Sequence, residues 1–159
     1  NLVINFLIIL SIFALDRITK EYVIFLDQQN FNSNIFSSSL VNIELIWNYG
    51  IAFGLLSSQE NYIYNFITTL IVSIIFLLIY LSIYSKSFKK YSYFMVIGGA
   101  LGNLYDRIVF SSVPDFIDIH YGEFHWFIFN VADIFITIGI ICLIYDEVLL
   151  QKKNNEKNF

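Results

Sequence analysis

Two aspartates in this sequence have the surroundings that acid–base chemistry requires. Asp133 lies inside FIFNVADIFIT at 127–137, with bulky apolar residues on both sides. Asp115 follows the sole proline, Pro114, whose restricted φ fixes how the carboxylate enters its segment. When two carboxylates from different segments meet in an apolar setting they cannot both ionise, so one keeps a proton while the other takes one from water. Such a pair is the catalytic arrangement of an aspartic hydrolase, in which the water attacks a peptide carbonyl.

Further polar residues stand near the ends of apolar segments. A charge in hydrocarbon costs at least ~2.5 kcal/mol, so such residues usually face partners or a cavity. Asp16 and Lys20 have the i,i+4 spacing of an ion pair on one helix face. The sequence favours this structural pair and a role in a functional site about equally. Asn103 precedes Asp106 and Arg107 closely enough to form a hydrogen-bonded cluster at a helix end. Arg107 is expected to extend to the lipid head groups.

Other kinds of site receive weaker support. The sole cysteine, Cys142, excludes an intramolecular disulfide and a cysteine metal cluster. No G-x-S-x-G setting accompanies the histidines, which are expected in a loop. A metal site is conceivable from hard and borderline ligands, but their spacing is irregular, and surface-loop residues are the simpler interpretation. These ligands would be Asp115, Asp118, His120, Glu123 and His125.

The elements that must position these residues are apolar helices. Hydrophobic residues make up 57% of the 159 residues and the mean hydropathy is +0.66, which is high for a soluble single domain. Residues 62–84 run without a charge over a length that exceeds the roughly 30 Å core of a bilayer. Segments 2–20, 91–108 and 126–146 reach this length if each tolerates polar residues. Segment 2–20 lacks the pattern of a cleaved signal peptide and is expected to remain as a helix.

The distribution of charge predicts the topology. Lysines occupy the loop at 85–92 and the tail at 147–159, whereas segments 27–60 and 110–125 hold acidic residues but no lysine or arginine. The positive-inside rule then places the loop, the tail and both termini in the cytoplasm. The other two segments lie outside, and Asp133 is expected about 10 Å below the external boundary. No sustained basic patch indicates nucleic acid.

The external part is expected to contain a small sheet on the membrane surface. Residues 41–47 alternate between apolar and polar types with a period near two, which is typical of a half-buried strand. Val113 is expected to be extended because it precedes a proline. In the third apolar segment Gly98 and Gly102 form a GxxxG pair, which is best explained by close helix packing.

Five motifs in order resemble one family, signal peptidase II, the prolipoprotein signal peptidase of bacteria. D-x-x-T-K appears at 16–20, N-x-G-x-A-F-G at 48–54, G-G-A-x-G-N-x-x-D-R at 98–107, V-x-D-F at 113–116 and N-x-A-D at 130–133. The combination is specific, although a lone D-x-x-T-K would mean nothing. The visible departure is Arg17, where many members carry glutamine.

The resemblance implies an α-helical integral membrane protein, a single domain with four transmembrane helices and a small extracytoplasmic β-cradle. It implies an aspartic dyad of Asp115 and Asp133. Asp106 is the alternative partner, but its neighbours Asn103 and Arg107 make an anchoring role sufficient for it. Supporting or substrate-binding positions carried over by motif are Asn103, Asp106, Arg107, Asn130, Asn48, Gly50, Asp16 and Lys20.

The implied substrate is a diacylglyceryl-modified prolipoprotein, cut just before its lipidated cysteine. The resemblance implies membrane lipids as partners, no metal or organic cofactor, and a monomer in the bacterial cytoplasmic membrane. A different hypothesis is a small four-helix transporter that uses Asp133 as an ion or proton site. The sequence lacks the internal repeats that such transporters usually carry.

Overall fold

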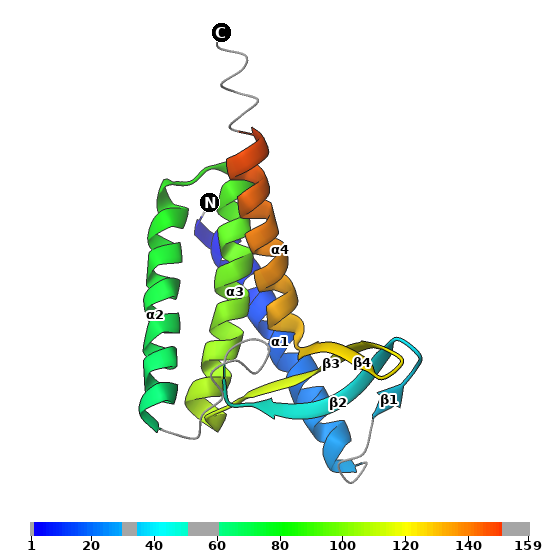
Figure 1. The fold of residues 1–159 in the computed structure, drawn as a ribbon. Coiled ribbons are helices and arrows are strands. Elements are labelled where there is room, and N and C mark those ends of the chain that lie inside the picture. The colour runs from blue at the N-terminus through cyan, green and yellow to red at the C-terminus, as the bar shows by residue number, and fades with distance from the viewer. Residues whose placement is uncertain (1, 30–34, 51–60, 151–159) are drawn as a thin grey trace.

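Four helices stand side by side, and a small sheet projects sideways from one end of them (Figure 1). The computed structural model describes residues 2–29, 35–50 and 61–150. The helices are α1 (Leu2–Gln29), α2 (Asn61–Tyr84), α3 (Ser87–Phe110) and α4 (Val131–Tyr145), which continues into the π-helical turn η2 (Asp146–Leu150). The strands are β1 (Phe36–Ser37), β2 (Val41–Asn48), β3 (Val113–Tyr121) and β4 (Phe124–Phe129).

The sheet is antiparallel with the order β1-β2-β3-β4. The strand predicted at 41–47 is confirmed by β2, and Val113 is extended as expected. Segments far apart in sequence meet here, since Asn48 pairs with Val113 and Ile117 with Phe129. The sheet therefore brings the N-x-G and V-x-D-F motifs next to each other at the end of the helices.

Alternation along β3 gives the sheet two unlike faces. Residues 117, 119 and 121 share the face of Asp115, and the β4 residues paired with them, Phe129, Phe127 and Phe124, lie on that face too. The opposite face carries Asp118, which is fully buried and lies 2.7 Å from His125 Nδ1. One face is thus apolar except for Asp115, and the other carries the polar Asp118 and His120 beside the apolar Phe116.

The fourth apolar segment differs from its prediction. Residues 126–129 belong to β4, so α4 begins at Val131 and Asp133 lies in the first helical turn. The helix predicted to begin at Trp126 is therefore wrong, and the depth of Asp133 below the external boundary stays a prediction. Hydropathy could not separate the two elements, because an aromatic strand and an apolar helix look alike without a break between them. The break is Asn130, whose side chain caps the helix.

Two further expectations need correction. The first helix extends to Gln29 rather than to residue 20, because nothing between these positions breaks a helix. The histidines predicted in a loop lie in strands, His120 in β3 and His125 in β4. In both places polar residues interrupt the apolar pattern, and such an interruption predicts a loop from sequence alone.

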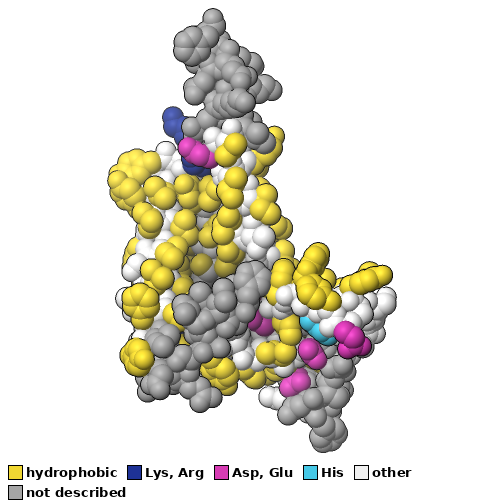
Figure 2. All heavy atoms as spheres, in the orientation of Figure 1, with side chains coloured by type: hydrophobic (Ala, Val, Ile, Leu, Met, Phe, Trp, Pro, Cys, Tyr) yellow, Lys and Arg dark blue, Asp and Glu magenta, His cyan; other side chains and the backbone are white. Residues whose placement is uncertain are grey.

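By length and composition, one helix among the described residues qualifies clearly as a membrane span, Tyr64–Tyr84, with a hydropathy of 2.6. The other helices carry charged residues or are shorter, so the predicted count of four spans stays a prediction. Apolar side chains nevertheless cover much of the helical surface in view (Figure 2). Basic side chains are visible with acidic ones beside them at the end where α2 joins α3, and further acidic side chains and histidine lie at the sheet.

Helix α3 packs against the other three helices, and glycines allow the closest approaches. A Cβ at Gly98 would lie 2.8 Å from Ile12 Cβ on α1, and one at Gly99 would lie 2.5 Å from the carbonyl oxygen of Ala132 on α4. The packing role expected for the Gly98 and Gly102 pair is confirmed, since a Cβ at Gly102 would overlap the Asp16 side chain. The glycines thus bring the polar residues of three helices within hydrogen-bonding distance.

Replacing Gly99 by alanine is expected to destabilise the fold by roughly 1–3 kcal/mol, the usual cost of forcing a methyl group into a packed interface. The obstacle is backbone rather than a flexible side chain, so α3 and α4 must separate. Thermal unfolding of the purified protein in detergent measures the effect. Ile108→Ala on the same helix is the control, because Ile108 is 68% exposed. An equal midpoint for Gly99→Ala and the wild type would contradict the close approach.

Candidate active site

Asp115 is held from two sides. Its carboxylate accepts a hydrogen bond of 2.6 Å from Asn130 Nδ2 and one of 2.8 Å from Asn48 Nδ2. Asn48 ends β2 and Asn130 precedes α4, so both the sheet and a helix hold this side chain. Only 3% of Asp115 is exposed. Its orientation is therefore set by groups that come from different parts of the chain.

Asp133 is held in a similar way. Asn103 Nδ2 on α3 donates to Asp133 Oδ1 at 2.9 Å, and the backbone N–H of Asn130 donates to Oδ2 at 3.1 Å. In return, Asn130 Oδ1 accepts from the backbone N–H of Asp133 at 3.1 Å, which completes a capping box. Asn130 thus contacts both aspartates, and it joins the V-x-D-F strand to the N-x-A-D helix.

Three asparagine side chains, those of Asn48, Asn103 and Asn130, are oriented in the same way. Each has its side-chain oxygen occupied by a donor, so that its amide N–H₂ must face an aspartate. The donor is the backbone N–H of Gly50 for Asn48, Lys20 Nζ for Asn103, and the backbone N–H of Asp133 for Asn130. The carboxylates therefore meet hydrogen-bond donors and not acceptors.

Lys20 lies at the centre of a buried charge cluster behind Asp133. Its ammonium group is fully buried and donates to Asp16 Oδ2 at 2.9 Å, Asn103 Oδ1 at 2.8 Å and Asp106 Oδ2 at 2.7 Å. Asp16 also accepts from the backbone N–H of Ala132 at 3.0 Å, and a carboxylate at this helix N-terminus is electrostatically favourable. The expected pair of Asp16 and Lys20 is thus present as part of a larger cluster.

Arg17 completes this cluster. Its guanidinium lies 2.7 Å from Asp106 Oδ1 and stacks at 4.8 Å over the ring of Tyr105. With Lys20, Asp16 and Asp106, it makes a group of two positive and two negative charges. The departure from the family pattern at this position therefore adds a countercharge inside the protein.

Arg107 does not extend to the head groups, so that expectation is wrong. It is 5% exposed and donates to the backbone carbonyl of Gly50. Its guanidinium lies 5.8 Å from the ring of Tyr64, whose hydroxyl donates to the Arg107 carbonyl at 2.5 Å. The cluster predicted from Asn103, Asp106 and Arg107 is also wrong, because on this helix Arg107 points away toward β2 while Lys20 joins the other two.

The two aspartates influence each other electrostatically. Burial, together with the negative charge of Asp133, raises the pKa of the Asp115 carboxyl to about 6, against the lowering effect of the hydrogen bonds from Asn48 and Asn130. Asp115 therefore keeps a proton up to a pH at which an ordinary aspartate is ionised. The pair can hold one proton and one negative charge at the same time.

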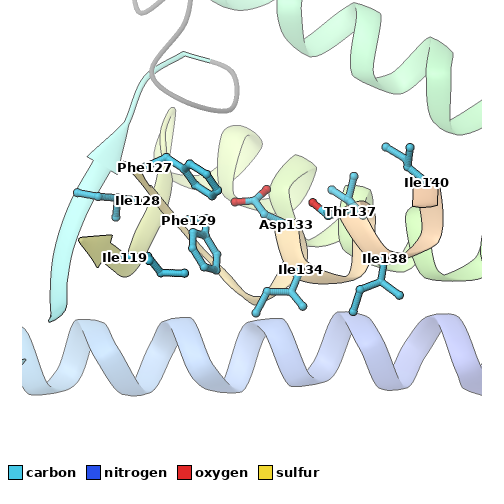
Figure 3. Close-up of a pocket in the computed structure, with 10 residues that line it drawn as sticks. Ile119, Phe127, Ile128, Phe129, Asp133, Ile134, Thr137, Ile138 and Ile140 are labelled. Carbon is cyan, nitrogen blue, oxygen red and sulfur yellow. The ribbon is translucent and has the colours of Figure 1, made fainter. Parts of the chain in front are cut away.

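An apolar groove of about 470 Å³ leads to Asp133. Figure 3 shows its walls, in which strand residues lie at one end and α4 continues along its length. Its lining residues are Ile119, Phe127, Ile128, Phe129, Asp133, Ile134, Ile136, Thr137, Ile138 and Ile140. The arrangement offers a protonatable pair at one end of a surface suited to hydrocarbon.

The site gathers most of the residues predicted from motifs. Asp115, Asp133 and the three asparagines are in direct contact through hydrogen bonds, and Asp16, Lys20 and Asp106 support them from behind. Gly50 and Arg107 anchor the chain after β2. The remainder of the N-x-G-x-A-F-G motif, including Gly54, lies outside the described residues.

Sequence reasoning missed the groove and Thr137. The only available signal was the i,i+4 spacing of Thr137 from Asp133, which places both on one helix face. A metal site is the alternative that the sequence leaves open for residues 115–125. Among the described residues, no group of three or more histidine, cysteine or acidic side chains is arranged to hold an ion. Asp118, His120 and His125 instead pack together on the opposite face of the sheet, with the two histidine rings stacked at 5.1 Å.

Comparison with known proteins gives one consistent result. The profile of the family described as signal peptidase (SPase) II matches residues 8–149. The lipoprotein signal peptidase of Pelagibacter ubique is 49% identical over 159 residues, covering 99% of this chain and 96% of that protein. The lipoprotein signal peptidase of Anaplasma marginale is 40% identical over 154 residues, covering 95% and 88%.

The fold is similar to that of solved bacterial membrane enzymes. One, determined by the in meso method at 2.3 Å resolution, superposes with a TM-score of 0.76 at 29% identity, covering 95% of this chain and 90% of the other. A second, at 1.9 Å resolution, gives a TM-score of 0.72 at 28% identity, covering 91% and 92%. The similarity extends over the sheet as well as the helices.

The interaction between the carboxyl groups predicts a measurable shift. Asp133→Asn removes a negative charge that raises the pKa of Asp115, so this pKa is expected to fall below its wild-type value of about 6. Infrared spectroscopy of the protonated carboxyl band against pH measures it: the Asp115 band should disappear as the pH rises, and earlier in the variant. Asp115→Asn identifies the band, and Asp118→Asn is the control. An unchanged midpoint in Asp133→Asn would show that the carboxyl groups do not interact.

Proposed function

Because this chain belongs to the signal peptidase II family, it has the activity of a lipoprotein signal peptidase, and we propose that it works as an aspartic endopeptidase with Asp115 and Asp133 as catalytic carboxylates. The observation that carries this proposal is the pair itself. Two aspartates from different motifs are held by a shared asparagine, and the negative charge of Asp133 helps to raise the pKa of the Asp115 carboxyl. The transporter hypothesis receives no support from the comparisons.

The chemistry needs one proton and one negative charge on the pair. The ionised carboxylate takes a proton from a water molecule whose oxygen attacks the scissile carbonyl carbon. The protonated carboxyl group donates to the carbonyl oxygen, which stabilises the negative charge that develops there. When the tetrahedral intermediate breaks down, the C–N bond is cleaved and the amine leaves with a proton from the pair. Water supplies the hydroxyl group that the new carboxyl gains and the hydrogen that the amine gains.

The surroundings of the pair suit this reaction. Amide donors hold both carboxylates in place, so their alignment for the reaction needs little reorganisation. Lys20 and Arg17 balance the charges of Asp16 and Asp106 behind the site. The net charge that the pair experiences from this cluster is therefore small.

The substrate is a diacylglyceryl-modified prolipoprotein, cut just before its lipidated cysteine. An acyl chain or the signal helix lies in the groove beside α4, where its apolar walls replace contact with lipid. Asp133 stands in the first turn of α4, so the scissile bond is reached near the junction of the sheet and the helices. The substrate enters from the bilayer, and the protein works as a monomer.

The site faces the external side of a bacterial cytoplasmic membrane that the chain crosses four times. The start of α1, the connection between α2 and α3 and the end of α4 lie at the end opposite to the sheet (Figure 1). The lysines near the α2–α3 connection support a cytoplasmic location for that end. The apolar face of the sheet, with exposed Tyr121, Phe124 and Phe127, then lies against the outer leaflet.

Asp115→Asn and Asp133→Asn are each expected to lower cleavage of a lipidated prolipoprotein by at least roughly 10²–10⁴-fold, because each removes an acid–base group. Processing is measured with purified protein and a diacylglyceryl-modified precursor peptide in detergent.

Asp118→Asn is the matched control, since Asp118 is a buried aspartate on the same strand that bonds with Asn42 and His125 on the opposite face. It is expected to keep activity within a few-fold, and thermal unfolding shows whether each variant folds. Normal cleavage by either dyad variant would overturn the assignment.

The topology is tested with single cysteines. Cys142→Ala removes the native thiol, after which Lys86→Cys in the α2–α3 connection and Glu123→Cys in the β3–β4 turn each introduce one. A membrane-impermeant maleimide should label Glu123→Cys in intact spheroplasts, and should label Lys86→Cys only after lysis. Labelling of Lys86→Cys in intact spheroplasts would contradict the proposed orientation.

A further inference from the structure

The groove beside α4 contains two polar side chains among its lining residues, Asp133 and Thr137. They are four residues apart, so Thr137 lies about 6 Å along the helix from Asp133. Thr137 is exposed in the groove, and its hydroxyl oxygen lies on the side of the residue that faces Asp133 (Figure 3). The other lining residues are isoleucine and phenylalanine.

The Thr137 hydroxyl differs from the other hydroxyls in the helices. Each described serine or threonine side chain within α1, α2 and α3 donates to a main-chain carbonyl three or four residues earlier, as Ser11, Thr68 and Ser92 do at 2.7, 2.9 and 3.1 Å. This bond is the usual way in which a helix satisfies such a group. In the described part of the chain, Thr137 has no hydrogen-bond partner.

An unpaired hydroxyl in apolar surroundings is unfavourable. Isoleucine, which occupies the neighbouring groove positions 134, 136, 138 and 140, would avoid the cost. The hydroxyl is also free to donate, since it is not used by the helix backbone. Its location one helical turn from the proposed catalytic carboxylate places it where a bound substrate extends along the groove.

We infer that Thr137 is a substrate-binding residue, whose hydroxyl donates a hydrogen bond to a carbonyl oxygen of the lipid-modified substrate beyond the scissile bond. This inference rests on the proposed function. The acceptor is a carbonyl in either case, and it belongs to a glyceryl ester of the lipid or to the backbone of the signal peptide. The bond orients the substrate in a groove that otherwise makes only non-directional contacts.

Thr137→Val removes the hydroxyl and keeps the shape, so it is expected to lower kcat/KM for a diacylglyceryl precursor peptide by roughly three- to tenfold, the worth of one hydrogen bond. Thr137→Ser keeps the donor and should recover most of the loss. The unfolding midpoint of Thr137→Ser should match the wild type and that of Thr137→Val should equal or exceed it, since Thr137 makes no bond with the described chain and valine removes an unpaired hydroxyl. Loss of activity in both variants to the same degree would overturn the inference.

A second substrate locates the acceptor. In a dialkylglyceryl peptide, ether links replace the ester carbonyls, so an ester acceptor predicts that Thr137→Val and the wild type cleave this peptide equally. A backbone acceptor predicts that the difference persists. Equal kcat/KM of Thr137→Val and the wild type on both substrates would refute the inference while leaving the function intact, whereas absence of cleavage by the wild type would refute the proposed function itself.

Discussion

The need to stabilise buried carboxylates governs this structure. Asp16, Asp106 and Asp133 on the helices and Asp115 on β3 all lie in largely apolar surroundings, where an uncompensated charge is very costly. Lys20 answers this need for the first two by bonding both at once, and three asparagines answer it for the last two. The close helix approaches follow from the same requirement, because a Cβ at Gly102 would displace Asp16.

The asparagines explain why the motifs have their spacings. In N-x-G, the Gly50 N–H occupies the oxygen of Asn48. In N-x-A-D, the Asp133 N–H does the same for Asn130, and the Ala132 N–H bonds Asp16 of another motif. An amide whose oxygen is occupied can present only its N–H₂ to a carboxylate. The motifs therefore encode the direction of each amide and not merely its presence, and glutamine or aspartate at these positions would lose that direction.

Asp133 has a charge cluster on one side and an apolar groove on the other. Behind it, Lys20 on α1 bonds Asn103 and Asp106 on α3, and Asn103 in turn bonds Asp133, which keeps the carboxylate aligned. In front of it, the groove offers apolar walls and the unpaired Thr137 hydroxyl. A lipid-bearing substrate can slide along such walls with little cost, so directional contacts must come from few residues. The division fits an enzyme whose substrate arrives through the bilayer.

The sequence by itself determined the short-range parts of this protein: the apolar helix α2, strand β2 and the i,i+4 pair of Asp16 and Lys20, within a recognisable family pattern. These depend on residues within a few positions of each other, where spacing specifies geometry. Tertiary structure alone decided that Lys20 reaches Asn103 and Asp106, that Arg107 turns to Gly50, and that β4 replaces the start of the predicted fourth helix. The physical reason is that an extended aromatic segment and an apolar helix bury similar surface, and that a long cation can satisfy any carboxylate in reach. Which choice is made depends on the neighbouring segment that packing supplies.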